Sequence, residues 1–310
     1  MQKKILRFSF AIGFHLAAIN AAWSGPDRPS ELTNSNSVVN TRHNMTQRSS
    51  LGADLLAGPP NSGGAGQMDT SRNDYGQVCV YCHTPHGANN TIAAPLWNRA
   101  IPATTYTTYN TLGTAVDQTY TQPGGSSLVC LSCHDGQQAV DAIMNMPGAG
   151  KYNSSPNFGF LETWQPGGFS TGSHLGLKSG ECLACHTPGV PFAPTATDFT
   201  VFAIGTDLRD DHPVGVSYPA SNGAGTDWKT PGGSVAKPGG ATLFFDDNGD
   251  GRMQKSEIRL YSTGQGPEVE CGSCHDPHGV PSAGIGSTFL PSFLRKTNSG
   301  SSVCLTCHSK

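Results

Sequence analysis

Hydrophobic residues are sparse along this chain, and only one stretch of them is continuous. That stretch runs from Phe8 to Ile19 and is interrupted only by His15 and a few small or polar residues. It follows basic residues and precedes small ones: Lys3, Lys4 and Arg7, then Ala22 to Ser24. We therefore predict that residues 1–24 are a secretory signal and that residues 25–310 form the mature chain. The alternative is an uncleaved anchor, although the stretch is short for a membrane span. We expect no further transmembrane segment.

Beyond residue 24 the apolar pieces are short and separated by glycine and proline. Only 36% of the residues are hydrophobic, and the 310 residues include 39 glycines and 22 prolines. This composition is poor for a self-sufficient core, and disorder is the alternative. Residues 241–245 have the pattern of a strand, whereas Leu128-Val129 and Ser302-Val303 lead into cysteine motifs. We expect mostly ordered loop with short helices and few strands.

The candidate chemistry lies in a pentapeptide, Cys-x-x-Cys-His, that occurs five times and uses all ten cysteines. In chain order the five motifs contain Cys79, Cys82 and His83; Cys130, Cys133 and His134; Cys182, Cys185 and His186; Cys271, Cys274 and His275; and Cys304, Cys307 and His308. Each is the attachment signature of a c-type haem, in which two thiols bond to the porphyrin and the histidine is the proximal iron ligand. We predict five haem c groups, around which the loops wrap as one domain.

Other cysteine chemistries fit the motifs less well. Zinc ribbons need pairs of CxxC motifs, and five is an odd number. A thioredoxin-like site would occur once, near a βαβ pattern. A disulfide framework would not require the same pentapeptide five times.

The histidines outside the motifs provide candidates for the sixth iron ligand. Leaving out His15, five remain: His43, His86, His174, His212 and His278. Five haems need five such ligands, so the count fits a protein in which every iron binds two histidines. The competing ligands are methionines, which we expect to pack instead: Met45, Met68, Met144, Met146 and Met253.

Two of these histidines follow their motif in the same context, His83-Thr84-Pro85-His86-Gly87 and His275-Asp276-Pro277-His278-Gly279. Three residues cannot carry the chain around a porphyrin edge, so His86 and His278 should each reach a second haem nearby. Together with the apolar lead of the second and fifth motifs, this suggests a duplicated two-haem unit around residues 79–134 and 271–308.

Residues 246–257 fit the pattern of a calcium-binding loop, D-x-[DN]-x-[DN]-G-x5-E. The candidate ligands are Asp246, Asn248, Asp250, the carbonyl of Arg252, and Glu257. The alternative is an Asx-rich turn without a metal.

The segments CVYCHTPHG, DDHPVGVSY, the DxNxDG loop, ECGSCHDPHG, FLR and VCLTCH resemble those of the doubled-CxxCH multihaem cytochromes. That group is similar to secreted cytochromes of metal-reducing bacteria, some of which form conductive filaments. In the filaments, an N-terminal histidine of one subunit ligates a haem of the next. The resemblance implies that His43 could cross such an interface in a homopolymer.

We expect electron transfer and not catalysis, because an iron with two histidines has no open site for a substrate. The first expectation is an extracellular or outer-surface conduit that passes electrons between redox proteins or to extracellular acceptors, with polymerisation as an option. The alternatives are a periplasmic shuttle and, less favoured, a multihaem reductase. The formal net charge of −3 does not suggest nucleic-acid binding.

Overall fold

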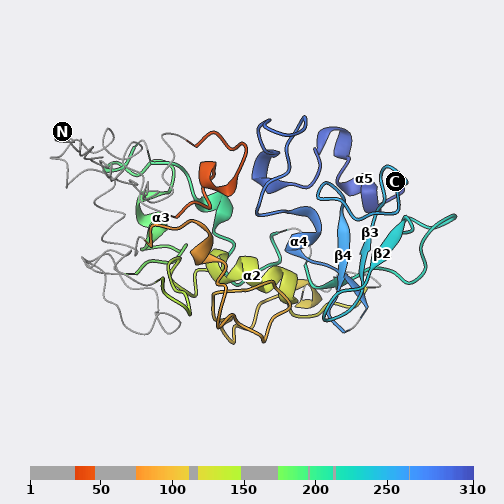
Figure 1. Cartoon of the computed structure of the whole chain (residues 1–310), viewed down its shortest axis with the longest axis horizontal. Helices are drawn as coiled ribbons and strands as arrows, with labels where there is room; N and C mark the ends of the chain where they lie inside the picture. Colours follow the sequence, from red (N-terminus) through yellow and green to blue (C-terminus); the bar gives the residue numbers. More distant parts are fainter. Residues whose placement is uncertain are drawn as a thin grey trace, which may run out of the picture.

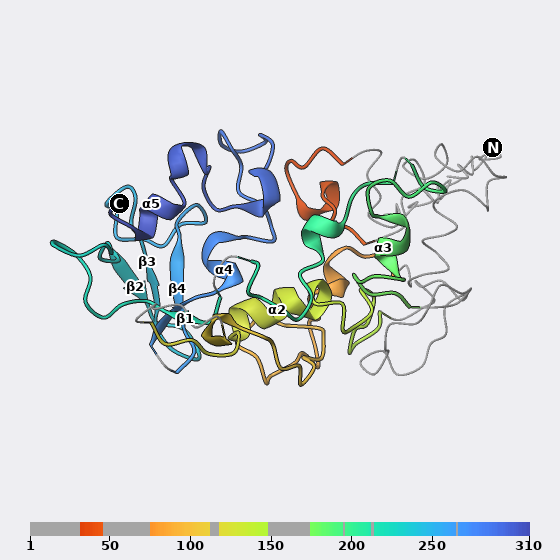
Figure 2. The same ribbon diagram turned by 180° about the vertical axis from the view of Figure 1, so that it is seen from behind.

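The computed structural model describes residues 32–45, 75–111, 118–147, 174–194, 196–211, 214–264 and 266–310. Within these ranges the chain is mostly loop with short helices and one small sheet, as predicted. The predicted signal segment and His212 lie outside the described residues. The helices α3, α2, α4 and α5 follow one another along the long axis, and the sheet lies at the α5 end (Figures 1 and 2).

The helices are short and are mostly single turns. The α-helices are α2 (Gly125–His134), α3 (Cys182–Cys185), α4 (Cys271–Cys274) and α5 (Cys304–Cys307). The 3-10 helices are η1 (Val38–Asn40), η2 (Cys79–Tyr81), η3 (Tyr109–Thr111), η5 (Thr200–Phe202), η6 (Pro291–Phe293) and η7 (Ser299–Ser301). In the described part of the chain, no helix is long and apolar enough to span a membrane.

The N-terminus of α2 is capped by a residue that is distant in the sequence. Its N-cap residue, Gly124, has no side chain to accept a hydrogen bond. Glu270 accepts one from the Gly124 N–H at 3.0 Å and a second from the Ser127 hydroxyl, and the Cys271 N–H donates to that hydroxyl. A carboxylate beside the exposed N–H groups of a helix start is stabilising. This contact joins α2 to α4.

The sheet is antiparallel, with the order β1-β5-β4-β3-β2. Its strands are β1 (Val216–Ser217), β2 (Gly233–Val235), β3 (Thr242–Phe244), β4 (Arg259–Ser262) and β5 (Pro267–Val269). The strand predicted at residues 241–245 is therefore confirmed as β3. Phe244 on β3 and Leu260 on the central strand β4 are fully buried.

The described residues form three small apolar clusters instead of one core. The first surrounds Tyr75 and Ile143, the second Leu131 and Leu208, and the third Ile258 and Leu260. Each cluster packs against at least one motif cysteine: Cys82, Cys271, or Cys274 and Cys307. Met45 packs against the first cluster, as expected of a methionine that fills space.

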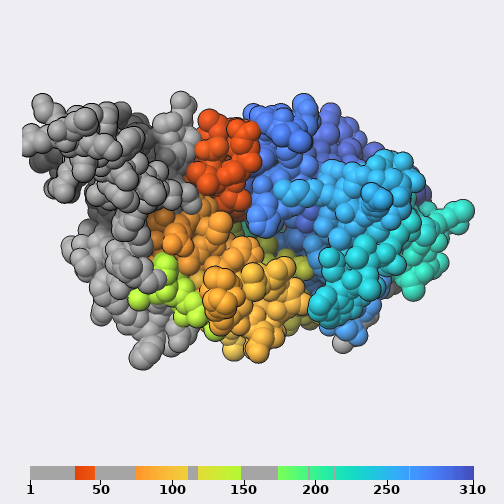
Figure 3. Space-filling model, viewed as in Figure 1, coloured from red at the N-terminus to blue at the C-terminus, as the bar shows by residue number. Residues whose placement is uncertain are grey.

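The N-terminal segment 32–45 packs against the C-terminal part of the chain. Figure 3 shows it as a red patch beside the blue surface. Ser35 pairs with Thr288 in an antiparallel bridge, and the Phe289 N–H donates to the Asn34 carbonyl. Residues far apart in the sequence are thereby brought together next to the fourth motif.

Candidate functional site

Each of the five CxxCH motifs forms or ends a helical turn, as predicted. The motifs coincide with η2, the end of α2, α3, α4 and α5. In the four motifs outside α2, the histidine N–H donates to the carbonyl of the first cysteine; for His83 the distance is 2.7 Å and for His275 it is 3.0 Å. One turn places the two thiols and the histidine on neighbouring positions of one surface, as attachment to one planar group requires.

The ten thiols are unpaired. All ten cysteines lie in the described ranges, and none of them forms a disulfide. Burial raises the pKa of Cys82, Cys182 and Cys307 to about 12, and that of Cys274 to about 11. A hydrogen bond with Cys130 instead lowers the pKa of Cys271. The four thiols with raised pKa differ from the reactive, low-pKa cysteines of redox sites.

Four of the five proximal histidines have a fixed tautomer. The Nδ1 atoms of His83, His134, His186 and His275 lie 2.6–2.8 Å from the backbone oxygens of Pro95, Phe202, Thr197 and Ser292, respectively. A carbonyl can only accept, so Nδ1–H donates and Nε2 keeps its lone pair. An orienting hydrogen bond at the other ring nitrogen is typical of a metal-bound histidine.

Three of the turns pair with a second segment in the same register. The Thr84 N–H donates to Leu96 O, and the Asn98 N–H donates to Cys82 O. In the fourth motif, the Asp276 N–H donates to Phe293 O, and the Arg295 N–H donates to Cys274 O. In the fifth motif, the Ser309 N–H donates to Asp227 O, and the Lys229 N–H donates to Cys307 O. The first and fourth motifs thus share a local structure as well as a sequence.

The ring of His278 lies beside that of His83. Their centroids are 6.0 Å apart, and the ring planes differ by 10°. The Nδ1 of His278 is 3.3 Å from Asp276 Oδ1, which leaves its Nε2 available. Burial disfavours the charge of Asp276, but hydrogen bonds from His278 and the charge of Arg295 outweigh burial and hold its pKa at about 2.

The ring of His43 lies beside that of His134, at 6.4 Å between centroids and with an interplanar angle of 77°. Its Nδ1–H donates to Pro277 O at 3.1 Å. Burial and the neighbouring His134 lower the pKa of His43 to about 4, so its imidazole is neutral, as a metal ligand must be. His43 therefore contacts His134 of its own chain, and its predicted role between subunits stays a prediction.

The other predicted distal ligands are less completely defined. His174 is buried, and its Nδ1 lies 2.7 Å from Asp141 Oδ2. His86 is exposed, and its ring has no hydrogen bond or ring contact with other described residues. Its glycine neighbour, Gly87, has φ +67°, and Gly279 after His278 has φ +77°, a region that strongly favours glycine.

Haem c fits these residues. The thiols are unpaired, and the tautomer of most motif histidines leaves Nε2 free. The buried Nε1 of Trp97, whose ring centroid is 6.1 Å from that of His83, has no hydrogen-bond partner among the described residues. When bound, haem supplies a one-electron redox centre. The thiols of each motif would attach it, and the adjacent histidine, oriented through Nδ1 in four of the five motifs, would bind its iron.

The candidate calcium loop uses its oxygens for internal hydrogen bonds. Asp246 accepts from the Gly249 and Gly251 N–H groups at 2.7 Å, and buried Glu257 accepts from the N–H groups of Asp247 and Gln254. No group of three or more metal-binding side chains was found among the described residues. These bonds agree with the alternative of an Asx-rich turn.

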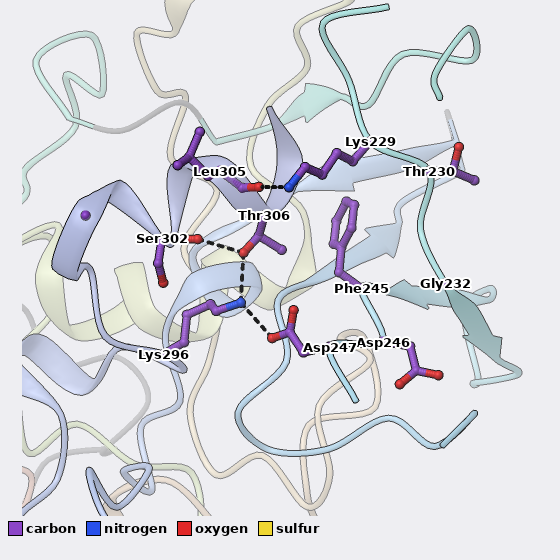
Figure 4. A pocket seen from close by; sticks show the side chains of 11 residues that line it. Lys229, Thr230, Gly232, Phe245, Asp246, Asp247, Lys296, Ser302, Leu305 and Thr306 are labelled. Atoms are coloured by element: carbon purple, nitrogen blue, oxygen red, sulfur yellow. Dashed lines mark hydrogen bonds and ion pairs between the residues drawn. The ribbon is translucent and has the colours of Figure 1, made fainter. Parts of the chain in front are cut away.

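An ion pair also connects this loop to the fifth motif. In a pocket of about 410 Å³, Lys296 Nζ lies 2.6 Å from Asp247 Oδ2 and 3.0 Å from Thr306 Oγ1 on α5 (Figure 4). In the same pocket, Lys229 Nζ donates to the Leu305 carbonyl at 2.6 Å. The loop thus has a structural contact that needs no metal.

Two buried arginines support the site and were missed from the sequence. Arg99 is fully buried and donates to the carbonyls of Ser132, Ala139 and Val140. Arg295 donates to the carbonyls of Gly272 and Lys255, and its Nη1 is 3.3 Å from Asp276. The sequence signal was weak: Arg295 lies in the segment that pairs with the fourth turn, and Arg99 directly follows the segment that pairs with the first.

Comparison with known families supports the C-terminal pair of motifs. Residues 265–310 match the family described as the doubled CXXCH motif. No curated protein sequence matches the chain. The family match confirms the resemblance to doubled-CxxCH proteins and indicates a multihaem c-type cytochrome with covalently bound haem c, a class that transfers electrons.

Proposed function

We propose that this protein is a five-haem c-type cytochrome that carries electrons outside the cytoplasm and catalyses no reaction of its own. The observation that carries the proposal is the repetition of one turn at all five motifs, with two unpaired thiols and an adjacent histidine. Four of these histidines are held through Nδ1, in the tautomer that binds iron through Nε2.

Contacts between the motifs support a continuous path for electrons. Phe199 stacks on His186 at 3.7 Å between ring centroids, and Phe202, from the same segment, binds His134. The second motif joins the fourth through Glu270. A path from the third motif through the second and fourth to the fifth follows the order of α3, α2, α4 and α5 along the molecule (Figure 1).

Two forms of this function differ in their assembly and location. The first is an extracellular or outer-surface conduit, which could polymerise, passing electrons to external acceptors. The second is a discrete periplasmic carrier that docks to redox proteins. The contacts of His43 with His134 and Pro277 of its own chain support a discrete molecule, because a His43 that ligates a haem of its own chain cannot also ligate a haem of a neighbouring subunit.

A redox titration of the purified mature protein, combined with its intact mass, tests the proposal. We expect the mass of five attached haems and reversible reduction of all of them. Fewer haems, or irreversible loss of absorbance on reduction, would contradict it. Electron microscopy of material sheared from cells separates the two forms, because filaments would require another interface ligand and discrete particles would favour the carrier.

A further inference from the structure

Two pairs of histidines approach each other from distant parts of the chain. His83 and His278 form one pair, and His134 and His43 form the other. Each pair combines the histidine of a motif in the first half of the chain with a histidine outside the motifs. No other pair of histidine rings is found in contact among the described residues.

We infer that His278 is the distal ligand of the haem attached at the first motif, and that His43 is the distal ligand of the haem attached at the second. The inference rests on the proposed haem content and adds to it which histidine serves which iron.

The separations fit a metal between the rings. An imidazole nitrogen binds a first-row transition metal at about 2 Å, so two rings bound in line on opposite sides of one ion have centres about 6 Å apart. The observed values are 6.0 Å and 6.4 Å. Direct ring stacking would bring the centres closer, as for His186 and Phe199 at 3.7 Å.

The hydrogen bonds at Nδ1 fit the same assignment. His83, His134 and His43 donate to the carbonyls of Pro95, Phe202 and Pro277, and His278 faces the carboxylate of Asp276. All four rings therefore have Nδ1 occupied and Nε2 available, which is the arrangement of a histidine that binds metal through Nε2.

One turn of the fourth motif presents both distal ligands. His278 belongs to that turn, and His43 is held by the carbonyl of Pro277, one residue earlier. The first two haems therefore lie next to each other, with the C-terminal half of the chain supplying or orienting the ligand on one side of each. Iron coordination would tie the N-terminal segment and the fourth motif to the first two motifs.

The two pairs differ in the angle between their rings, which gives the experiment its readout. Nearly parallel axial imidazoles give ferric low-spin haem a rhombic EPR spectrum, and nearly perpendicular ones give a highly anisotropic spectrum. With angles of 10° and 77°, the first haem should be rhombic and the second highly anisotropic.

The test is EPR with spin integration on the ferric, mature holoprotein and its variants. We expect His278→Ala to lose one haem equivalent of the rhombic signal and to gain one haem that binds cyanide. His43→Ala should instead lose one haem equivalent of the highly anisotropic signal. If either alanine variant fails to mature, His278→Met and His43→Met keep a sixth ligand and should show the same selective loss, with a sulfur-ligated haem in its place.

Arg209→Ala is the control, because it removes only an exposed ion pair with Asp207 and no candidate iron ligand. It should leave both signals intact. The pairing is overturned if all haems are attached and His278→Ala retains the full rhombic intensity, or if His43→Ala retains the full anisotropic intensity. A wild-type protein without low-spin haem would instead overturn the proposed function.

Discussion

The CHxPHG turns of the first and fourth motifs have nearly the same sequence and backbone hydrogen bonds, but their final histidines differ. In the fourth turn, Asp276 lies 3.3 Å from His278 Nδ1 and is itself held by Arg295. In the first turn, the hydroxyl of Thr84 donates instead to the carbonyl of His86. The residue after the proximal histidine thus determines whether the distal histidine has a carboxylate to orient it.

The segments that pair with these turns differ in a matching way. Asn98 donates to the Val80 carbonyl in the first turn, and Arg295 donates to the Gly272 carbonyl at the equivalent place in the fourth. Only the arginine extends far enough to reach the carboxylate after the proximal histidine. The comparison teaches that an acidic residue at that position depends on a buried cation in the partner segment.

Replacing Arg295 should break the fourth turn most strongly. Arg295→Leu removes the buried cation that pairs with Asp276 and the donor to the carbonyls of Gly272 and Lys255. Loss of one member of a buried ion pair costs about 3–5 kcal/mol. We expect the free energy of unfolding of the holoprotein to fall by this amount, which a lower denaturant midpoint would show. Arg209→Leu, which removes an exposed pair with Asp207, is the control and should change it little. Equal effects would contradict the account.

The glycines that end the two turns should differ in their tolerance of a side chain. Both have positive φ, so alanine costs about 1 kcal/mol at either position. A Cβ at Gly279 would also collide with the buried ring of Phe289, whereas a Cβ at Gly87 meets the amide of Asn145. We expect Gly279→Ala to lower the thermal midpoint clearly more than Gly87→Ala. The reverse order would show that the turns are packed differently.

Removing the charge of Asp276 should change the redox potential of one haem, in addition to the loss of stability expected when the buried pair with Arg295 is broken. Asp276→Asn replaces a charged acceptor with a neutral one, which weakens a hydrogen bond by about 1 kcal/mol. A less basic His278 stabilises ferric iron less, so the potential of one haem should rise by about 40 mV, by the conversion of a one-electron couple. Spectroelectrochemical titration measures this. Thr84→Val, at the equivalent place in the first turn, should leave that potential unchanged.

Calcium should have the smallest effect. The 246–257 loop supports the fourth turn through protein contacts, since Lys255 Nζ donates to Gly279 O at 2.8 Å and Lys296 pairs with Asp247. We expect the thermal midpoint in excess chelator to lie within about 1 °C of that in calcium. A saturable rise with calcium concentration would mean that the ion binds the folded state.

Features that depend on neighbouring residues could be predicted from the sequence. The CxxCH motifs identified the helical turns because two thiols and a histidine must share one surface, and the apolar stretch before Asp246 identified β3. The two CHxPHG segments also indicated a local likeness between the first and fourth motifs, which their hydrogen bonds show.

Features that depend on distant residues could not be predicted in this way. Glu270 caps α2 from a position more than a hundred residues later, and Pro277 holds His43 across a similar distance. Nothing in a linear pattern specifies such pairs, because they form only when the chain folds. The proximity of His43 to His134 is likewise visible only in three dimensions, and a role for His43 between subunits stays a prediction.

The central claim is that every haem iron is held by two protein ligands and serves only to carry electrons. Cyanide titration of the ferric mature protein, followed by EPR and optical absorbance, tests this most directly. The account predicts low-spin haem throughout and no spectral change with cyanide. A high-spin signal amounting to one haem in five, converted to low spin by cyanide, would reveal an open iron site and would contradict it.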